Sequence, residues 1–121
     1  MGLFTVRVGI AHPTDSTKRT EFELWVDTGA TLSQIPRELA DQLGVPRLGT
    51  RSFFLADGRK IDRETAGAML YINGRQGYVT VIVGEPGDGH LLLGATALET
   101  LGFVIDPIGK RLVPQEHIAQ Y

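Results

Sequence analysis

Cysteine is absent from the 121 residues of this sequence. Disulfide bonds, thiolate metal sites and a cysteine nucleophile are therefore excluded. Long apolar runs are also absent, and none approaches the roughly 20 residues that a membrane-spanning helix needs. The first five residues, Met-Gly-Leu-Phe-Thr, lack the basic and apolar segments of a secretory signal. We expect a cytoplasmic protein that makes no use of a membrane.

A strong charge of either sign is lacking as well. The formal net charge is −2, and the basic residues are scattered along the chain. Nothing in this balance favours nucleic acid as a partner. The histidines at 12, 90 and 117 are far apart, so we expect solvated side chains rather than metal ligands. We therefore expect no metal and no cofactor. A chain of this length predicts one domain, residues 1–121.

Alternation of apolar and polar residues dominates the chain and is typical of half-buried strands. The chain is interpreted as having strands over 4–10, 21–26, 51–56, 69–72 and 78–83, with shorter ones over 31–35, 103–106 and 111–114. The apolar run 91–93 has no alternation and is interpreted as a buried strand. The polar stretch 12–19 is interpreted as a loop. The pattern predicts an all-β, mostly antiparallel domain.

Turn and helix signals complete this prediction. Asp57-Gly58 and Asn73-Gly74 are strong hairpin turn signals, and the strand returning from the first turn should begin near residue 60. Pro36 suits the first position of a short helix that ends at Gly44. A second helix is expected over 95–101. One or two short helices should thus accompany the strands.

The most informative motif is Val-Asp-Thr-Gly-Ala at 26–30, followed far downstream by Leu-Leu-Leu-Gly at 91–94. A bare Asp-Thr-Gly triplet is more often a simple turn. Here an apolar strand precedes it and a second apolar element ends in glycine. Gly29 would let the backbone approach the Asp27 carboxylate, since it has no Cβ. This context favours a catalytic loop.

Two carboxylates that share a proton can hydrolyse a peptide bond. One is ionised and takes a proton from water, while the other is protonated and polarises the carbonyl. The shared proton belongs to the pair of carboxylates rather than to either residue. Because the chain contains Asp-Thr-Gly once, the second carboxylate must come from another copy. We therefore expect a homodimer.

With these motifs in view, the chain resembles the retropepsin-like aspartic proteases, the single-domain dimeric class that includes retroviral proteases. The resemblance runs from about Phe4 to Pro114. It implies a partly closed barrel and an aspartic endopeptidase that binds an extended peptide in a cleft between subunits. It also implies roles for individual residues. These are Asp27 as the catalytic carboxylate, Thr28 at the dimer axis, Gly29 and Ala30 facing the substrate, Leu55, Ala56, Asp57 and Gly58 near the tip of a closing flap, and Leu93 and Gly94 in a supporting second loop.

The sequence departs from this family at two positions. Viral members commonly place Asp after Asp-Thr-Gly-Ala and Arg after the second-loop glycine, whereas this chain has Thr31 and Ala95. Since both partners of that salt bridge are missing together, we expect a different support. Ala30 cannot donate a side-chain hydrogen bond to the carboxylate, as serine or threonine would. We therefore expect activity that extends to weakly acidic pH.

Two other functions remain open at this point. The first is a non-catalytic, protease-like dimer that binds peptides or serves as an assembly module. The second is a monomeric β-barrel binding module in which the triplet is coincidental. The sequence leaves the natural substrate and the cleavage preference undetermined.

Overall fold

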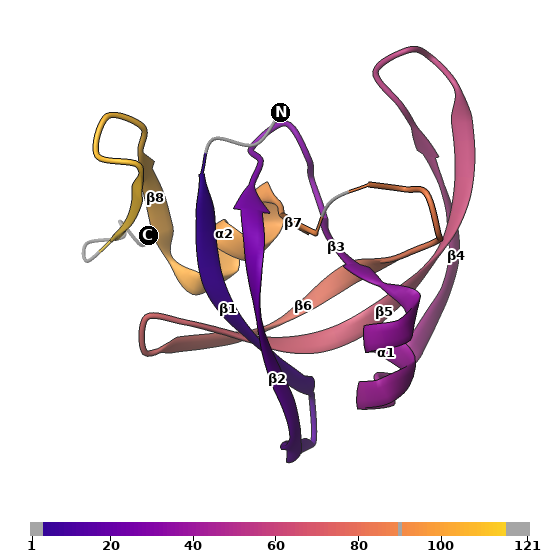
Figure 1. Ribbon diagram of the computed structural model, residues 1–121, viewed down its shortest axis with the longest axis horizontal. Coiled ribbons are helices and arrows are strands. Elements are labelled where there is room, and N and C mark those ends of the chain that lie inside the picture. Colours follow the sequence, from indigo (N-terminus) through magenta and orange to yellow (C-terminus); the bar gives the residue numbers. More distant parts are fainter. Residues whose placement is uncertain (1–3, 90, 116–121) are drawn as a thin grey trace, which may run out of the picture.

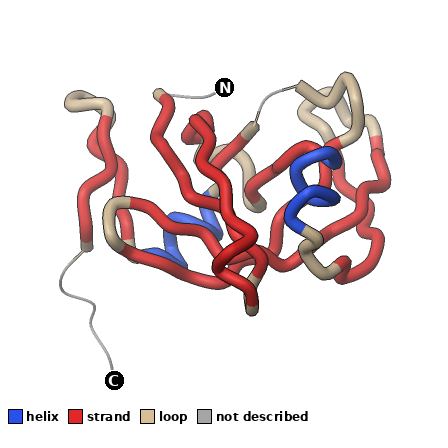
Figure 2. The backbone as a smooth tube through the Cα atoms, turned by 60° about the horizontal axis from the view of Figure 1, so that its bottom comes forward, coloured by secondary structure: helices blue, strands red, loops and turns tan. Residues whose placement is uncertain are grey.

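The computed structural model describes residues 4–89 and 91–115, and strands make up most of this part of the chain (Figure 2). The strands are β1 (Thr5–His12), β2 (Asp15–Val26), β3 (Ser33–Pro36), β4 (Arg47–Phe54), β5 (Lys60–Ile72), β6 (Arg75–Gly84), β7 (Leu92–Leu93), β8 (Phe103–Asp106) and β9 (Arg111–Pro114). Two short helices, α1 (Arg37–Leu43) and α2 (Ala95–Leu101), complete the described elements.

Seven strands form one sheet in the order β1-β2-β7-β3-β6-β5-β4. Strand β1 also pairs with β5, so the sheet partly closes on itself. Strands β8 and β9 form a separate antiparallel hairpin. The predicted all-β, partly closed barrel with short helices is therefore confirmed. In Figure 1 the β4–β5 hairpin rises on one side of the molecule and the β8–β9 hairpin on the other.

The core forms because the apolar positions of the strands face one another inside the closed sheet. Fully buried side chains include Ile10, Leu24, Ile35, Leu70 and Val81. Both helices add one apolar face to this core, with Leu39, Ala40 and Leu43 from α1 and Ala97, Leu98 and Leu101 from α2. Each helix ends at a glycine in the left-handed region, as the sequence predicted: Gly44 at φ 64° and Gly102 at φ 76°.

The predicted loop over 12–19 is wrong, because β2 already begins at Asp15. Its first residues are mostly exposed, so polar side chains occupy a strand whose surroundings are solvent. Arg19 illustrates the arrangement, since its guanidinium lies 4.0 Å from the centroid of the Tyr71 ring. The polar composition of this segment therefore reflects exposure to solvent, and a strand is present nonetheless.

Three boundaries also differ from the prediction. Pro36 is the last residue of β3, where it pairs with Gly84, and it precedes the helix rather than opening it. Strand β4 begins at Arg47 instead of residue 51. Strand β6 begins at Arg75 instead of residue 78, because Asn73 and Gly74 alone form the turn, both with positive φ. The predicted strand 69–72 is the end of the long β5.

Candidate active site

Asp27 lies directly after β2, at a tight turn whose backbone is held from two sides. Its amide donates to the carbonyl oxygen of Leu93 over 3.0 Å, and its own carbonyl accepts from the Ala30 amide over 3.2 Å. The Gly29 amide donates to Oδ1 of the Asp27 carboxylate, with 2.9 Å between nitrogen and oxygen. A Cβ at Gly29 would lie 3.2 Å from that oxygen. The turn therefore orients the carboxylate through main-chain groups.

Strand β7 places Leu93 and Gly94 beside this turn. It pairs in parallel with β2, where Val26 lies opposite Leu93, and antiparallel with β3, where Gln34 lies opposite Leu92. Val26 and Leu93 are both fully buried. The predicted second loop thus adjoins the Asp27 turn, and apolar side chains exclude water from behind it.

Three hydrogen bonds join the Asp27 loop to the start of α2. The Ala95 amide donates to the Ala30 carbonyl over 2.8 Å, and the Thr96 amide donates to the Thr31 carbonyl over 3.0 Å. The Gly94 amide donates to Oγ of Ser33 over 2.9 Å. These bonds connect the two segments around Thr31 and Ala95, the two positions at which the sequence departs from the expected pattern. The expectation of a different support agrees with this geometry.

Two of these positions have strict steric or polar requirements. A Cβ at Gly94 would lie 2.7 Å from the carbonyl carbon and oxygen of Leu32, so the loops approach too closely for any side chain. Ser33 is buried, and sequence reasoning missed it. The signal was present, however, because Ser33 alternates with the apolar Ile35 along the strand, and a hydroxyl on a buried face needs an internal hydrogen bond.

A cavity of about 410 Å³ lies between the Asp27 loop and the β4–β5 hairpin. Among the described residues that line it, none is charged. Gly29, Ala30 and Leu55 were predicted at such a site. The hairpin of about residues 51–65, expected to be the flap, contributes Ser52, Phe53, Phe54 and Ile61, and the second-loop segment contributes Leu92. Sequence reasoning missed four further lining residues: Thr31, Leu32, Gln34 and Ile82. These residues lie in segments that were predicted as strands, but no local motif assigned them to a cavity.

Ala56, Asp57 and Gly58 do not line this cavity and instead form the turn of the hairpin. The Gly58 amide donates to the Leu55 carbonyl over 2.9 Å, and Gly58 has φ 87°. The Asp57 carboxylate accepts hydrogen bonds from the Arg59 backbone amide and from the Arg59 side chain. The first of these is the main cause that holds the pKa of Asp57 below its ordinary value, and the second adds to it. Asp57 thus stabilises the turn.

A charged pair anchors the base of this hairpin. Arg63 of β5 donates from Nε and from Nη2 to the two carboxylate oxygens of Asp88, over 2.6 and 2.5 Å. Oδ2 of Asp88 also accepts from the Glu85 amide over 2.7 Å. The hydrogen bond from Arg63 is the main cause that lowers the pKa of Asp88. The pair therefore links β5 to the loop that precedes β7.

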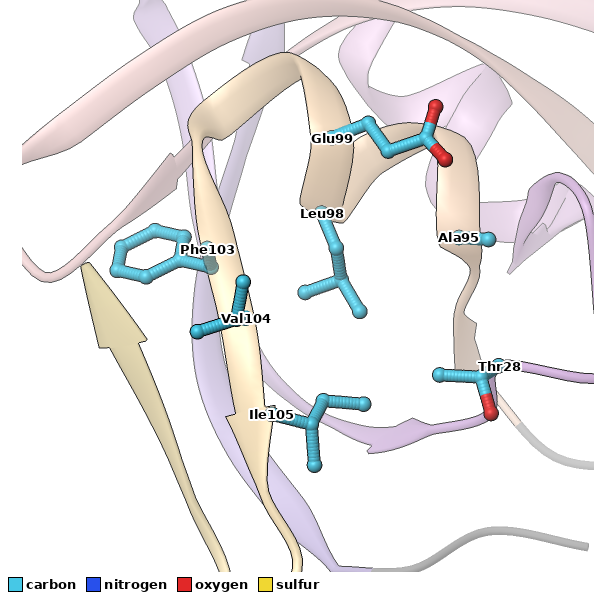
Figure 3. A pocket seen from close by; sticks show the side chains of 7 residues that line it. All are labelled: Thr28, Ala95, Leu98, Glu99, Phe103, Val104 and Ile105. Carbon is cyan, nitrogen blue, oxygen red and sulfur yellow. The ribbon is translucent and has the colours of Figure 1, made fainter. Parts of the chain in front are cut away.

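Thr28 faces a different hollow, a mostly apolar cavity of about 240 Å³ beside α2 and β8, with Glu99 as the one charged residue in its described lining. Figure 3 shows Leu98 from the helix and Ile105 from the strand pointing into the space in front of Thr28. The neighbouring Val104 leaves 46% of its surface exposed. This surface is therefore apolar and open, and it begins one residue from Asp27.

Two further expectations concern metals and membranes. No group of three or more histidine, aspartate or glutamate side chains within residues 4–89 and 91–115 is arranged to hold a metal ion. His90 and His117 lie outside the described residues. No described helix is long and apolar enough to cross a membrane.

Comparison with known proteins defines the class of this fold. The chain is similar to EIAV protease complexed with the inhibitor HBY-793, with a TM-score of 0.62 and 18% sequence identity over 90% of each chain. The fold is thus that of a retroviral-type protease. Residues 16–100 match the family described as "gag-polyprotein putative aspartyl protease", and the chain belongs to that family. A search of curated proteins finds no match.

Proposed function

We propose that this protein is an aspartic endopeptidase whose active site forms when two copies bring their Asp27 carboxylates together. The observation that carries the proposal is the Asp27 turn, in which the Gly29 amide bonds the carboxylate beside a cavity of peptide-binding size. Membership of the aspartyl protease family supports the same chemistry.

In this mechanism the ionised carboxylate of one copy takes a proton from a water molecule. The water oxygen attacks the peptide carbonyl carbon, while the protonated carboxylate of the other copy donates its proton to the carbonyl oxygen. Proton transfer to the amide nitrogen then allows the carbon–nitrogen bond to break. Main-chain contacts from Gly29 and Leu93 hold each carboxylate in place, so little reorganisation is needed during the reaction.

The surface around Thr28 is the proposed contact between the two copies. It combines the apolar cavity, the exposed Val104 and a threonine next to the catalytic residue. Burying this surface against a second copy would remove apolar area from water. It would also bring the two Asp27 turns to a common axis, where Thr28 of each copy can bond to its counterpart.

The substrate is an extended peptide that lies in the 410 Å³ cavity, with the β4–β5 hairpin closing over it as a flap. Phe53, Leu55 and Ile82 offer apolar contacts there. Side chains of an extended peptide alternate in direction, so alternate residues would enter such pockets. Phe54 is 78% exposed near the hairpin tip, which places it where a closing flap gains new contacts.

The test is turnover of a peptide library by the natural protein and by Asp27→Asn. The variant keeps the shape of the side chain but removes the ionisable group, so cleavage should fall to background. Glu38→Gln, at an exposed position on α1, is the matched control and should retain activity. Equal cleavage by Asp27→Asn would overturn the proposal. Tight peptide binding without turnover by any form would favour the non-catalytic module.

A further inference from the structure

A second cavity of about 250 Å³ adjoins the first along the β4–β5 hairpin. The two cavities share Gln34, Leu55 and Ile61 as lining residues. The second one extends toward Arg59, Arg63 and Asp88, and the Asp27 loop does not line it. A peptide side chain that enters it would therefore lie away from the cleaved bond. Its lining is charged, in contrast with the first cavity.

Gln34 lies at the border between the two cavities with its amide available to a ligand. The absence of a side chain at Gly84 leaves room for it, because a Cβ there would lie 2.9 Å from the amide nitrogen of Gln34. Within the described residues, the amide has no hydrogen-bond partner, and its atoms stay accessible to solvent. A partly buried amide in this state can bond to a substrate at low cost, since it exchanges hydrogen bonds to water and breaks none within the protein.

Most charges around the cavity are already compensated. Asp88 accepts from Arg63 at both oxygens and from the Glu85 amide, so its negative charge is paired. Arg37 pairs with Glu64 over 2.7 Å and with Glu85 over 2.6 Å. These pairs leave the lining close to neutral apart from Arg59.

Arg59 is the cation that a ligand can engage. Its guanidinium contacts Asp57 two residues away at 2.7 Å, and both side chains are largely exposed. Such surface pairs are weak and exchange readily with solvent. A carboxylate that enters the cavity from a substrate would be partly shielded from water, and its bond to Arg59 would be charge-assisted. Arg59 can therefore exchange Asp57 for such a ligand.

We propose that this second cavity is a specificity subsite for an acidic side chain of the substrate, bound by the Arg59 guanidinium and the Gln34 amide. The proposal rests on the proposed function, because it describes one part of the same peptide cleft. It assigns two residues that select the substrate without touching the reacting atoms. The enzyme would then prefer peptides that carry apolar side chains near the cleaved bond and glutamate or aspartate farther away.

The experiment uses one cleavable peptide in which glutamine is replaced by glutamate, one position at a time on each side of the cleaved bond. At one outer position, glutamate should raise kcat/KM about tenfold, which is the size expected for a hydrogen bond to a charged group. Arg59→Gln should reduce this advantage to about twofold, and Gln34→Leu should reduce it as well. Lys60→Gln removes a positive charge from the same hairpin outside the cavity, and it should keep the full advantage.

Binding of the same peptides to Asp27→Asn separates this proposal from the proposed function. Fluorescence anisotropy measures Kd without turnover, and the glutamate peptide should bind more tightly in a manner that depends on Arg59. If the protein cleaves nothing but shows this difference, the subsite stands and the protease proposal fails. If no position gains from glutamate, the subsite proposal is overturned. It is also overturned if Arg59→Gln and Gln34→Leu keep the same gain as the natural protein.

Discussion

The hydroxyl of Ser33 accepts a hydrogen bond from the backbone amide of Gly94, with 2.9 Å between Oγ and nitrogen. Ser33 begins β3, just after the Asp27 loop, and Gly94 precedes α2. The bond is buried and joins two segments that are far apart in the sequence. It holds the two loops together and thereby supports the turn that carries Asp27.

Replacement of Ser33 by alanine tests this relationship. The change leaves the buried Gly94 amide without an acceptor, and it should lower the free energy of unfolding by about 1–3 kcal/mol. Urea denaturation of both forms measures the difference. Ser52→Ala is the control, since its hydroxyl bonds to Asp62 at an exposed site and its loss should have a smaller effect. An equal effect of the two changes would contradict the role given to Ser33.

Gly94→Ala should be more damaging than a glycine replacement in an open turn. Its Cβ would lie 2.7 Å from the Leu32 carbonyl, so the two loops must separate. We expect a loss of about 2 kcal/mol or more, typical of overpacking against a backbone that cannot yield. Gly74→Ala meets no atom within 4 Å and carries only the strain of φ 83°, worth about 1 kcal/mol. Thermal unfolding of both variants gives the comparison, and similar losses would argue against the close approach.

Ala30→Ser should move the pH profile of activity. Ala30 lines the large cavity and lies in the same turn as Asp27. A hydroxyl there is expected to donate a hydrogen bond to the active carboxylate pair and to stabilise its ionised form. The acid limb of the kcat/KM profile should therefore shift to lower pH in Ala30→Ser. An unchanged limb, or a shift to higher pH, would show that position 30 does not contact the pair.

Much of the fold could be predicted from the sequence because its local signals agree with its tertiary structure. Asn73 and Gly74 both have positive φ in one predicted hairpin turn, and Gly58 has positive φ in the other. The bounds 95–101 are those of α2, because glycines flank an apolar helical segment. The start of β2 could not be found in this way, since its polar residues are ordered by pairing with β1 rather than by their own preference.

The residues of the candidate site also fall into two groups, those that local motifs predict and those that only the folded sheet brings together. Asp27, Gly29 and Gly94 belong to short motifs whose chemistry is local, and the structure brings them together around one turn. Gln34 and Arg63 lie on strands far apart in the sequence, and a folded sheet is needed to place both beside the second cavity. No periodicity indicates that Arg63 will form a largely buried pair with Asp88 while Arg59 pairs with Asp57 at an exposed position.

Asp88→Asn should destabilise the hairpin base, and it should do so mainly at neutral pH. The pKa of Asp88 is lowered in the folded state, chiefly by the hydrogen bond from Arg63. Its contribution to stability is therefore present above the unfolded pKa of about 3.9 and is lost as the pH falls through the lower folded value. We expect a loss of about 1–2 kcal/mol at pH 7.

Urea midpoints at pH 7 and in the acid range measure this change. The difference between the natural protein and Asp88→Asn should narrow as the pH is lowered. Asp57→Asn removes a carboxylate from an exposed pair at the hairpin tip, where the asparagine oxygen can still accept from the Arg59 amide, and should cause a smaller loss at pH 7 than Asp88→Asn. A difference that is constant with pH would mean that the Asp88 charge does not stabilise the fold.

Mixing active and inactive chains gives the strictest test of the shared active site. If each site needs Asp27 from two copies, a dimer of one natural chain and one Asp27→Asn chain is inactive. After exchange with a ninefold excess of the variant, random pairing leaves about a tenth of the original activity per natural chain. A monomeric enzyme would keep its full activity. The excess should have no effect when the variant also carries Val104→Asp, because the added charge should keep that chain from binding at the proposed contact surface.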